Sequence, residues 1–259
     1  MLLTVARVLF LNMLGSTILL LIWQVGHIAV GQFLPPPLTV LHTSFSILFE
    51  SRYLVGLGLP KGGLLPHLQV TTLSVLVGLV LGTLIGLATG LASAFSNVIR
   101  QIIAPMAAFI GTLPLLVAAP FFLMWFGVSA SARVSLVAAY SALVVHTYAY
   151  QAVGNMNRTY REYSATLGSG RLHTFLYVVM PAAMPEILGG IRVALGAAWG
   201  LVAITEILGS VTGIGRVIVA TWGVYDITTM MAAIIWLSLL ALILDGLMML
   251  LREWVLRWA

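Results

Sequence analysis

The sequence contains no cysteine and a single lysine, and charged residues make up only 7% of its 259 residues. The absence of cysteine excludes disulfides, cysteine-ligated metal sites and thiol catalysis, and it leaves the redox compartment undetermined. Basic residues are too sparse for a phosphate-binding surface, so we expect no nucleic-acid partner. His-x3-His, His-Glu-x2-His and Gly-x-Ser-x-Gly are also missing, which argues against a metal site or a serine nucleophile of those kinds.

The lysine, Lys61, bears on nucleotide binding. A phosphate-cradling loop needs Gly-x4-Gly-Lys followed by Ser or Thr, whereas Lys61 stands in Leu-Pro-Lys-Gly-Gly. We therefore expect no ATP, Mg²⁺ or other cofactor to be bound by this chain. It is predicted not to be an enzyme by itself, and any ATP hydrolysis would belong to a separate protein.

What the sequence does contain is apolar surface. Hydrophobic residues make up 61% of the chain, against the 45–50% that is usual in soluble domains, and the mean hydropathy is +1.10. A soluble fold of this length could not bury so much apolar surface. Short alternating segments typical of a β-barrel are absent, and the apolar runs are long. We expect an all-α integral membrane protein, with residues 1–259 forming one transmembrane domain.

A helical span needs about 20 mainly apolar residues. Six segments meet this requirement: Val8–Val30, Leu68–Ala92, Ile102–Phe126, Val134–Val153, Ile187–Leu208 and Thr228–Leu251. The first is too long for the apolar core of a cleavable signal, so we expect it to be retained. Basic residues predominate in the segments that lie inside if both termini are cytoplasmic, which favours that orientation.

The longest predicted outer connection, residues 31–66, contains Pro35–Pro37, which cannot continue a helix. Residues 38–49 can form a short amphipathic helix, either as a contact for an external partner or as a connector on the membrane surface. Within the second span, four glycines recur every four residues, at positions 78, 82, 86 and 90. This spacing places them on one helix face and favours close packing with another helix over a ligand site.

Prolines interrupt the third span, at positions 105, 114 and 120. Such residues bend a helix and free backbone carbonyls. The bends can line a pathway, or they can be ordinary kinks in a packed bundle.

The most polar stretch runs from Arg158 to Pro181, between apolar spans. Glu162 is followed six positions later by Gly168, and nine residues then lead to Val178-Val179-Met180-Pro181. We expect a short helix over 162–167, a turn at Gly168-Ser169-Gly170 and a second short helix over 171–179 that ends at Pro181. A solvated loop whose charges only fix the topology is the alternative.

The spacing Glu-x5-Gly-x9-apolar-x-apolar-Pro resembles the cytoplasmic signature loop of ABC importer permeases, whose pattern is Glu-Ala-Ala-x3-Gly-x9-Ile-x-Leu-Pro. Tyr163 and Ser164 replace the two alanines, and the bulkier Tyr163 could alter how the loop meets its partner. Short apolar motifs extend the likeness to the nitrate, sulfonate and taurine subgroup over nearly the whole chain from residue 33. These motifs are Phe-Leu-Pro-Pro-Pro at 33–37, Trp-Phe-Gly at 125–127, Pro-Ala-Ala-Met-Pro at 181–185 and Gly-Ile-Gly at 213–215.

This resemblance implies a six-helix type I permease in the bacterial cytoplasmic membrane that imports a small solute, such as a sulfonate, taurine or nitrate. The implied partners are a cytoplasmic ABC ATPase dimer, which binds ATP and Mg²⁺, a second permease copy, an external solute-binding protein and membrane lipid. By position, the coupling loop at about 155–185 would use Glu162, Tyr163, Gly168, Arg171 and Pro181. Some members of the subgroup suit heterocyclic vitamin precursors or aromatic acids instead.

Two residues of the fifth span are candidates for the translocation path. Trp199 lies among small residues in a helix that lines the central path of related permeases, although packing of its ring beside those residues is the alternative. Glu206 lies near the outer end, either on the path or hydrated at the membrane surface. Arg192 is expected to be an inner anchor and Asp245 a packing or snorkelling group. Because the spans offer almost no other cation, solute selectivity is expected to reside mainly in the binding protein.

Two other classes of protein compete with this prediction. An ion-gradient-driven secondary transporter would need a midplane ion site and internal repeats, and no convincing repeat is visible. A membrane-embedded enzyme would need clustered polar or metal-binding residues at a shared depth, which the spans do not offer. The importer permease is therefore the preferred interpretation, and the secondary transporter is the alternative.

Overall fold

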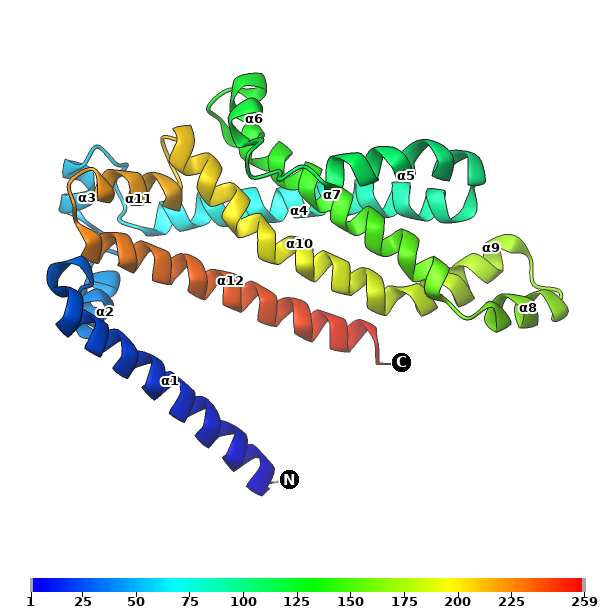
Figure 1. Ribbon diagram of the computed structural model, residues 1–259, viewed down its shortest axis with the longest axis horizontal. Coiled ribbons are helices and arrows are strands. Elements are labelled where there is room, and N and C mark those ends of the chain that lie inside the picture. The colour runs from blue at the N-terminus through cyan, green and yellow to red at the C-terminus, as the bar shows by residue number, and fades with distance from the viewer. Residues whose placement is uncertain (1, 258–259) are drawn as a thin grey trace. The chain divides into compact units, whose positions relative to one another are not determined.

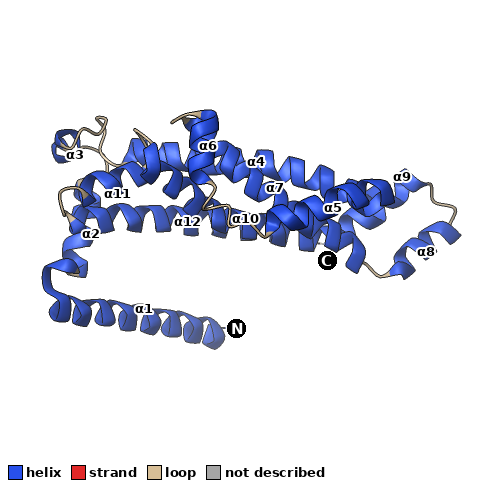
Figure 2. Cartoon of the chain, turned by 45° about the horizontal axis from the view of Figure 1, so that its top comes forward, coloured by secondary structure: helices blue, strands red, loops and turns tan. Residues whose placement is uncertain are grey.

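The computed structural model describes residues 2–257, and every regular element within that range is helical (Figure 2). The chain divides into two compact units. One consists of Met1–His67 and Val217–Trp236, and the other of Leu68–Arg216 and Leu237–Ala259. The second unit contains most of the apolar core and the whole polar stretch between residues 158 and 181.

The first unit contains α1 (Leu2–Val30), the 3₁₀ turn η1 (Gly31–Phe33), α2 (Pro37–Ser46) and α3 (Arg52–Gly56). The indole N–H of Trp23 on α1 donates to the carbonyl of Pro35 at 3.0 Å and so fixes the turn after α1. The helix α2 begins at Pro37, a position where proline costs no hydrogen bond. The prediction of a short helix after the three prolines is therefore confirmed.

Two further contacts close the first unit. Trp236 donates from its indole N–H to the carbonyl of Ser44 at 3.0 Å, and its ring meets Phe45 edge to face. Asp226 caps α12 (Ile227–Val255) by accepting from the backbone N–H of Thr229 at 3.0 Å. Burial, together with a hydrogen bond to Asp226, raises the pKa of Tyr53 on α3 to about 12.

The second unit is built around α4 (Leu65–Phe95), α7 (Ala130–Asn155) and α10 (Met180–Gly209). Figure 1 shows α7 and α10 running side by side, and their facing residues form the apolar core with α4 and the later part of α12. Val75, Leu136, Val145 and Val202 lie fully buried in this core. The shorter helices α5 (Asn97–Gly111) and α6 (Ala119–Phe126) also belong to this unit, whereas α11 (Ile214–Trp222) begins in it and belongs to the first unit from Val217 onward.

The glycine stripe of α4 packs against α7, which confirms the close packing predicted from the four-residue spacing. A Cβ added at Gly82 would lie 2.5 Å from the carbonyl oxygen of Ala138, and one at Gly86 would lie 2.6 Å from that of Ala142. Real Cβ atoms do not approach backbone oxygens this closely. The two backbones therefore touch along the stripe, and only glycine allows it.

The predicted third span, Ile102–Phe126, is wrong as a continuous helix. The structure has α5 as far as Gly111 and α6 from Ala119, with turns between them. Pro114 and Pro120 lack the backbone N–H that a continuous helix needs, so the chain breaks there. By contrast, Pro105 is accommodated inside α5.

Four helical segments within the described residues are long and apolar enough to cross a membrane: Phe10–Val30, Leu65–Phe95, Arg171–Gly209 and Ile227–Val255. They correspond to the predicted first, second, fifth and sixth spans. The predicted fourth span lies in α7, which has 26 residues but contains Arg133, His146 and several hydroxyl side chains. The protein is thus an all-helical, multi-pass chain, while the count of six spans stays a prediction.

Candidate functional site

The polar stretch forms two short helices joined by a tight turn. Helix α8 (Arg158–Thr166) begins after Asn157, whose side chain accepts from the backbone N–H of Thr159 at 3.0 Å. Gly168 then adopts a φ of 72°, and α9 (Arg171–Thr174) follows. Left-handed backbone of this kind favours glycine, because a Cβ would press against the following carbonyl. The predicted helix–turn–helix and the glycine at its turn are confirmed in geometry.

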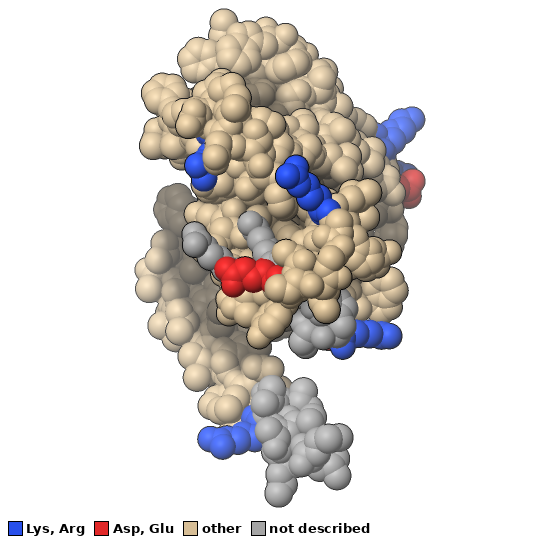
Figure 3. Space-filling view, turned by 90° about the vertical axis from the view of Figure 1, so that its right-hand side faces the viewer, with Lys and Arg blue, Asp and Glu red and all other residues tan. Residues whose placement is uncertain are grey.

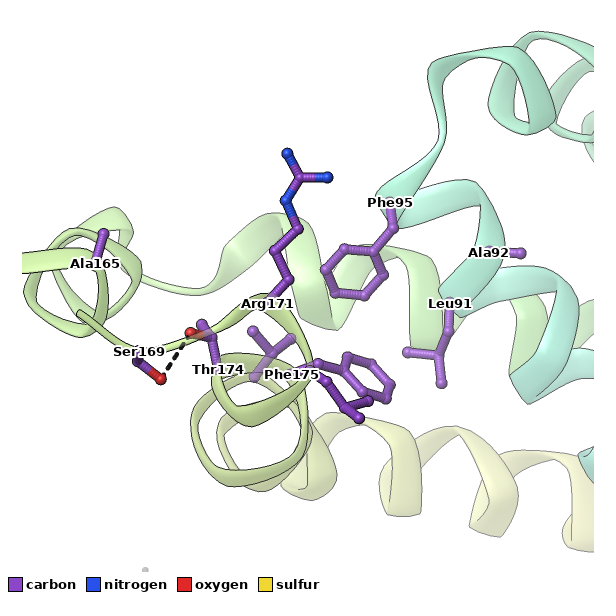
Figure 4. Close-up of a pocket in the computed structure, with 10 residues that line it drawn as sticks. Leu91, Ala92, Phe95, Ala165, Ser169, Arg171, Thr174 and Phe175 are labelled. Atoms are coloured by element: carbon purple, nitrogen blue, oxygen red, sulfur yellow. Dashed lines mark hydrogen bonds between the residues drawn. The ribbon is translucent and has the colours of Figure 1, made fainter. Parts of the chain in front are cut away.

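Three hydroxyl side chains hold the turn closed. The hydroxyls of Ser164 and Thr174 lie 2.7 Å apart. The Thr174 hydroxyl also donates to that of Ser169 at 3.3 Å, the bond drawn as a dashed line in Figure 4. Ser164 is buried, although α8 is otherwise largely exposed. This residue replaces the second alanine of the family pattern, so the departure adds a hydrogen bond that fastens α8 to α9. Residues 162–181, which the resemblance identifies with the signature loop, are called the coupling loop below.

Pro181 does not end the second helix, contrary to the prediction. After Thr174 the chain continues as the π-helical turn η2 (Phe175–Val179) and passes directly into α10. The wider turn is closed by a bond from the N–H of Met180 to the carbonyl of Phe175, five residues back. Pro181 is the second residue of α10 and lies in its first turn, where proline is tolerated because no hydrogen bond of that helix is lost. The loop is therefore continuous with a 39-residue helix, Arg171–Gly209.

The outer surface of the coupling loop is partly apolar. Tyr163 and Leu172 are exposed, as is Glu162, and the side chain of Leu167 at the turn is 86% exposed. In the face that Figure 3 shows, blue side chains are scattered over a surface that is largely uncharged. Exposed leucine and tyrosine side chains beside single charges are the composition expected of a protein-binding surface.

An apolar pocket of about 670 Å³ lies between the coupling loop and the end of α4. Phe95 from α4 and Phe175 from η2 contact each other edge to face, with ring centres 5.3 Å apart. Figure 4 shows the Arg171 guanidinium pointing away from these rings. Through the phenylalanine contact, the loop touches the helix that carries the glycine stripe.

Glu206, a candidate for the translocation path, lies inside the second and larger of the two units and is 1% exposed. Its carboxylate accepts from the hydroxyl of Thr71 on α4 at 2.9 Å and from the backbone N–H of Gly215 at 2.9 Å. The Thr71 hydroxyl in turn accepts from the N–H of Ile214 at 3.0 Å. The carboxylate thus fastens α4 and the start of α11 to the end of α10, and it is not hydrated at the surface.

Arg133 completes this buried cluster from α7. Its Nε lies 4.0 Å from the Glu206 carboxylate and donates to the hydroxyl of Ser74 at 3.2 Å. One terminal N–H donates to the hydroxyl of Ser210 at 2.6 Å. These contacts indicate that Glu206 and Arg133 join helix ends, and a role of Glu206 in the path stays a prediction.

Trp199, the other candidate, is 5% exposed and belongs to the apolar core of the larger unit. Gly196 and Gly200, its small neighbours, lie on the exposed side of the same helix. The arrangement fits the packing alternative, in which the ring fills the core, and a contact of Trp199 with solute stays a prediction.

A pair that the sequence did not connect joins α10 to α12. Arg192 donates from Nε and Nη2 to the two carboxylate oxygens of Asp245 at 2.6 and 2.7 Å. The expected inner anchor and the expected packing group are thus partners. The sequence signal was weak, because the two residues lie 53 positions apart and each has several ordinary explanations.

The comparison with known proteins decides the family. The family model of the binding-protein-dependent transport system inner membrane component matches residues 78–257, which include the coupling loop, α10 and the whole of α12. The chain belongs to this family. It is an ABC importer permease: a multi-pass inner-membrane transport subunit and not an enzyme.

Two curated relatives resemble the permease over most of its length. It is 27% identical to a protein of Bacillus subtilis named as an aliphatic sulfonates transport permease, SsuC, over 95% of this chain and 87% of that one. It is 30% identical to the riboflavin transport system permease RibX of Chloroflexus aurantiacus, over 93% of this chain and 87% of that one. Relatives of this family thus carry the names of chemically different solutes.

Among solved structures, the permease resembles a chain of the MetNI methionine ABC transporter in an inward-facing conformation. The TM-score is 0.66 at 18% sequence identity, and the match covers 79% of this chain and 99% of that chain. This likeness shows that the fold is that of a type I importer permease.

Proposed function

We propose that the permease is one of two membrane subunits of an ATP-driven importer and is driven through the coupling loop at residues 162–181. The observation that carries the proposal is the loop itself. It combines the family spacing, a glycine in the left-handed region at the turn and hydrogen bonds between hydroxyl side chains that hold its two helices together. A small closed unit of this kind can transmit a push from a bound protein, because it moves as one piece and continues directly into α10.

The partners follow from this role. A cytoplasmic ABC ATPase dimer binds ATP and Mg²⁺ and receives the exposed face around Tyr163 and Leu167. A second permease copy forms the other half of the path, and an external binding protein delivers the solute. Alternating access requires each nucleotide state to favour one conformation of the permease pair, since a ligand shifts an equilibrium only by its difference in affinity. We also propose that both termini lie in the cytoplasm, the orientation that the distribution of basic residues favours.

For the solute we propose a small organic anion, such as a sulfonate or taurine, with nitrate in the same class. The likeness to SsuC covers 95% of the chain, and the described residues of α10 contain a cationic side chain, Arg192, well inside the helix. The likeness to RibX makes an uncharged heterocycle the natural competitor. An arginine among apolar residues favours the anion.

The test is uptake by the reconstituted complex. Permease, ATPase and binding protein are co-expressed, purified together and placed in liposomes, and radiolabelled taurine, an alkanesulfonate and riboflavin are offered with and without ATP. We expect ATP-dependent uptake of a sulfonate and none of riboflavin. Uptake that persists without ATP and stops when an ion gradient is dissipated would refute the ATP-driven importer. ATP-driven uptake of riboflavin alone would refute only the solute class.

A further inference from the structure

The Arg192–Asp245 pair lies well inside two apolar helices. Arg192 is twelve residues after the start of α10 and Asp245 is ten residues before the end of α12. At a rise of 1.5 Å per residue these separations are about 18 and 15 Å. The two parallel N–H bonds are the geometry in which guanidinium and carboxylate interact most strongly. Neither group reaches the end of its helix in this arrangement.

The pair is nevertheless open to its surroundings. The Arg192 and Asp245 side chains are 42% and 39% exposed, whereas the Arg133 and Glu206 side chains are 7% and 0% exposed. Charged groups inside membrane-spanning helices normally face a bundle interior or water, because lipid solvates them poorly. Of these two pairs, one is buried and the other is left uncovered. The uncovered pair therefore needs polar surroundings from outside this subunit.

The helix face around Arg192 leaves room for a ligand. Gly189, Gly196 and Gly200 lie three residues before it and four and eight residues after it, so they share its face of α10. A Cβ built at any of these glycines would meet nothing within 4 Å. The guanidinium is thus flanked by open space along the helix, unlike the glycines of α4, whose space is filled by α7.

We propose that Arg192 binds the anionic group of the transported solute, and that Asp245 is the counter-ion that holds the guanidinium between transport cycles. This inference rests on the proposed function and adds a contact within the membrane to it. Sulfonate or carboxylate oxygens accept the two N–H bonds that Asp245 accepts in the resting state, and the displaced Asp245 carboxylate is hydrated by the path. No covalent bond changes. In a symmetric pair of permeases each copy presents its own Arg192.

The first experiment compares variants of the whole complex in ATP-driven taurine uptake. In R192Q/D245N the two amides can still bond to each other, so a purely structural tie survives. We expect the KM for taurine to rise about tenfold or more, as for loss of a charge-assisted hydrogen bond, with assembly with the ATPase retained. In D245N the guanidinium remains without a competing carboxylate, so we expect a lower KM and a lower kcat, because solute binds more readily and leaves more slowly.

A structural role predicts a different order. D245N would then be the more damaged variant, since it leaves a cation without its partner, and R192Q/D245N would behave as wild type. That order overturns the inference. If the wild-type complex imports taurine or an alkanesulfonate and the double variant matches it, only the Arg192 site fails. If the wild-type complex hydrolyses ATP and imports no anion, the proposed solute class and the site fail together.

The second experiment asks what faces Arg192. Because the chain has no cysteine, a G196C variant of the complex carries a single thiol on this face of the permease. We expect it to react with a water-soluble, membrane-impermeant thiol reagent added to vesicles with the cytoplasmic face outward. Taurine should slow the labelling in the wild-type background and leave it unchanged in R192Q/D245N. Reaction with a lipid-soluble maleimide alone, or no effect of taurine in either background, would overturn the site.

Discussion

Replacement of Gly168 by valine should uncouple ATP hydrolysis from transport. Gly168 has a φ of 72°, and a Cβ built there meets nothing within 4 Å. The cost of G168V is therefore one of backbone conformation and not of a clash. Left-handed backbone costs about 1–2 kcal/mol for a residue with a Cβ, which lowers the population of the native turn by about 5- to 30-fold relative to other loop conformations. Membrane insertion should be unaffected, because the turn lies outside the apolar segments.

The assay is the ratio of solute imported to ATP hydrolysed by the reconstituted complex. We expect this ratio to fall in G168V and, less strongly, in G168A, while G168N stays close to wild type because asparagine tolerates the left-handed region. G170A is the matched control: it adds the same methyl group two residues away, where φ is −67° and space is also open. Equal coupling ratios in G168A, G168V and G170A would refute the reasoning.

Two further predictions concern the larger unit. G82A should destabilise the permease by about 1–3 kcal/mol, as overpacking does, because its Cβ would lie 2.5 Å from the carbonyl oxygen of Ala138. The measurement is thermal unfolding in detergent, and the control is G154A, which should be neutral or stabilising because the space around Gly154 is open. Equal unfolding midpoints for G82A and G154A would contradict the packing. E206A should cost about 3–5 kcal/mol, since it leaves Arg133 buried without its partner. E206Q should cost less, because its amide oxygen still accepts the buried N–H and O–H bonds, and the same unfolding assay would contradict this account if E206Q lost as much stability as E206A.

Features set by local spacing could be predicted from the sequence. Glycines four residues apart necessarily share a helix face, so the stripe from Gly78 to Gly90 predicted a close helix contact, although nothing in the sequence named α7 as the partner. The signature spacing around Glu162 likewise predicted the loop. Its positive φ fell at Gly168, the glycine in the family position, and not at Gly170, which adopts ordinary extended backbone.

Proline was a less reliable guide, because its effect depends on the surrounding backbone. The third predicted span breaks after Gly111, near Pro114, as proline chemistry suggests. Pro181 instead lies within a continuous helical stretch, in the first turn of α10 directly after the π-turn Phe175–Val179. A pattern of apolar residues and prolines cannot show which of these two outcomes a chain adopts.

Contacts between distant segments could not be read from the sequence. Glu206 is bound by Thr71, which lies 135 positions away, and Arg192 by Asp245, 53 positions away. Taken alone, Glu206 suggested the translocation path or a hydrated position at the membrane surface, Arg192 suggested an inner anchor, and Asp245 suggested a packing or snorkelling group. Only the packing of α4, α7, α10 and α12 shows that the pair of Glu206 and Arg133 lies in the interior, whereas the pair of Arg192 and Asp245 lies open.

The central claim is that a cytoplasmic ATPase binds the tip of the coupling loop and through it drives the conformational change of this permease. A single cysteine introduced by L167C, at a side chain that is 86% exposed, tests it most directly in the otherwise cysteine-free chain. In the assembled complex we predict a cross-link from this thiol to the ATPase subunit, and labelling by an impermeant reagent only in inside-out vesicles. An F49C control in the outer connection should label only in right-side-out vesicles. A loop thiol that labels from the outside and never cross-links to the ATPase would contradict the account.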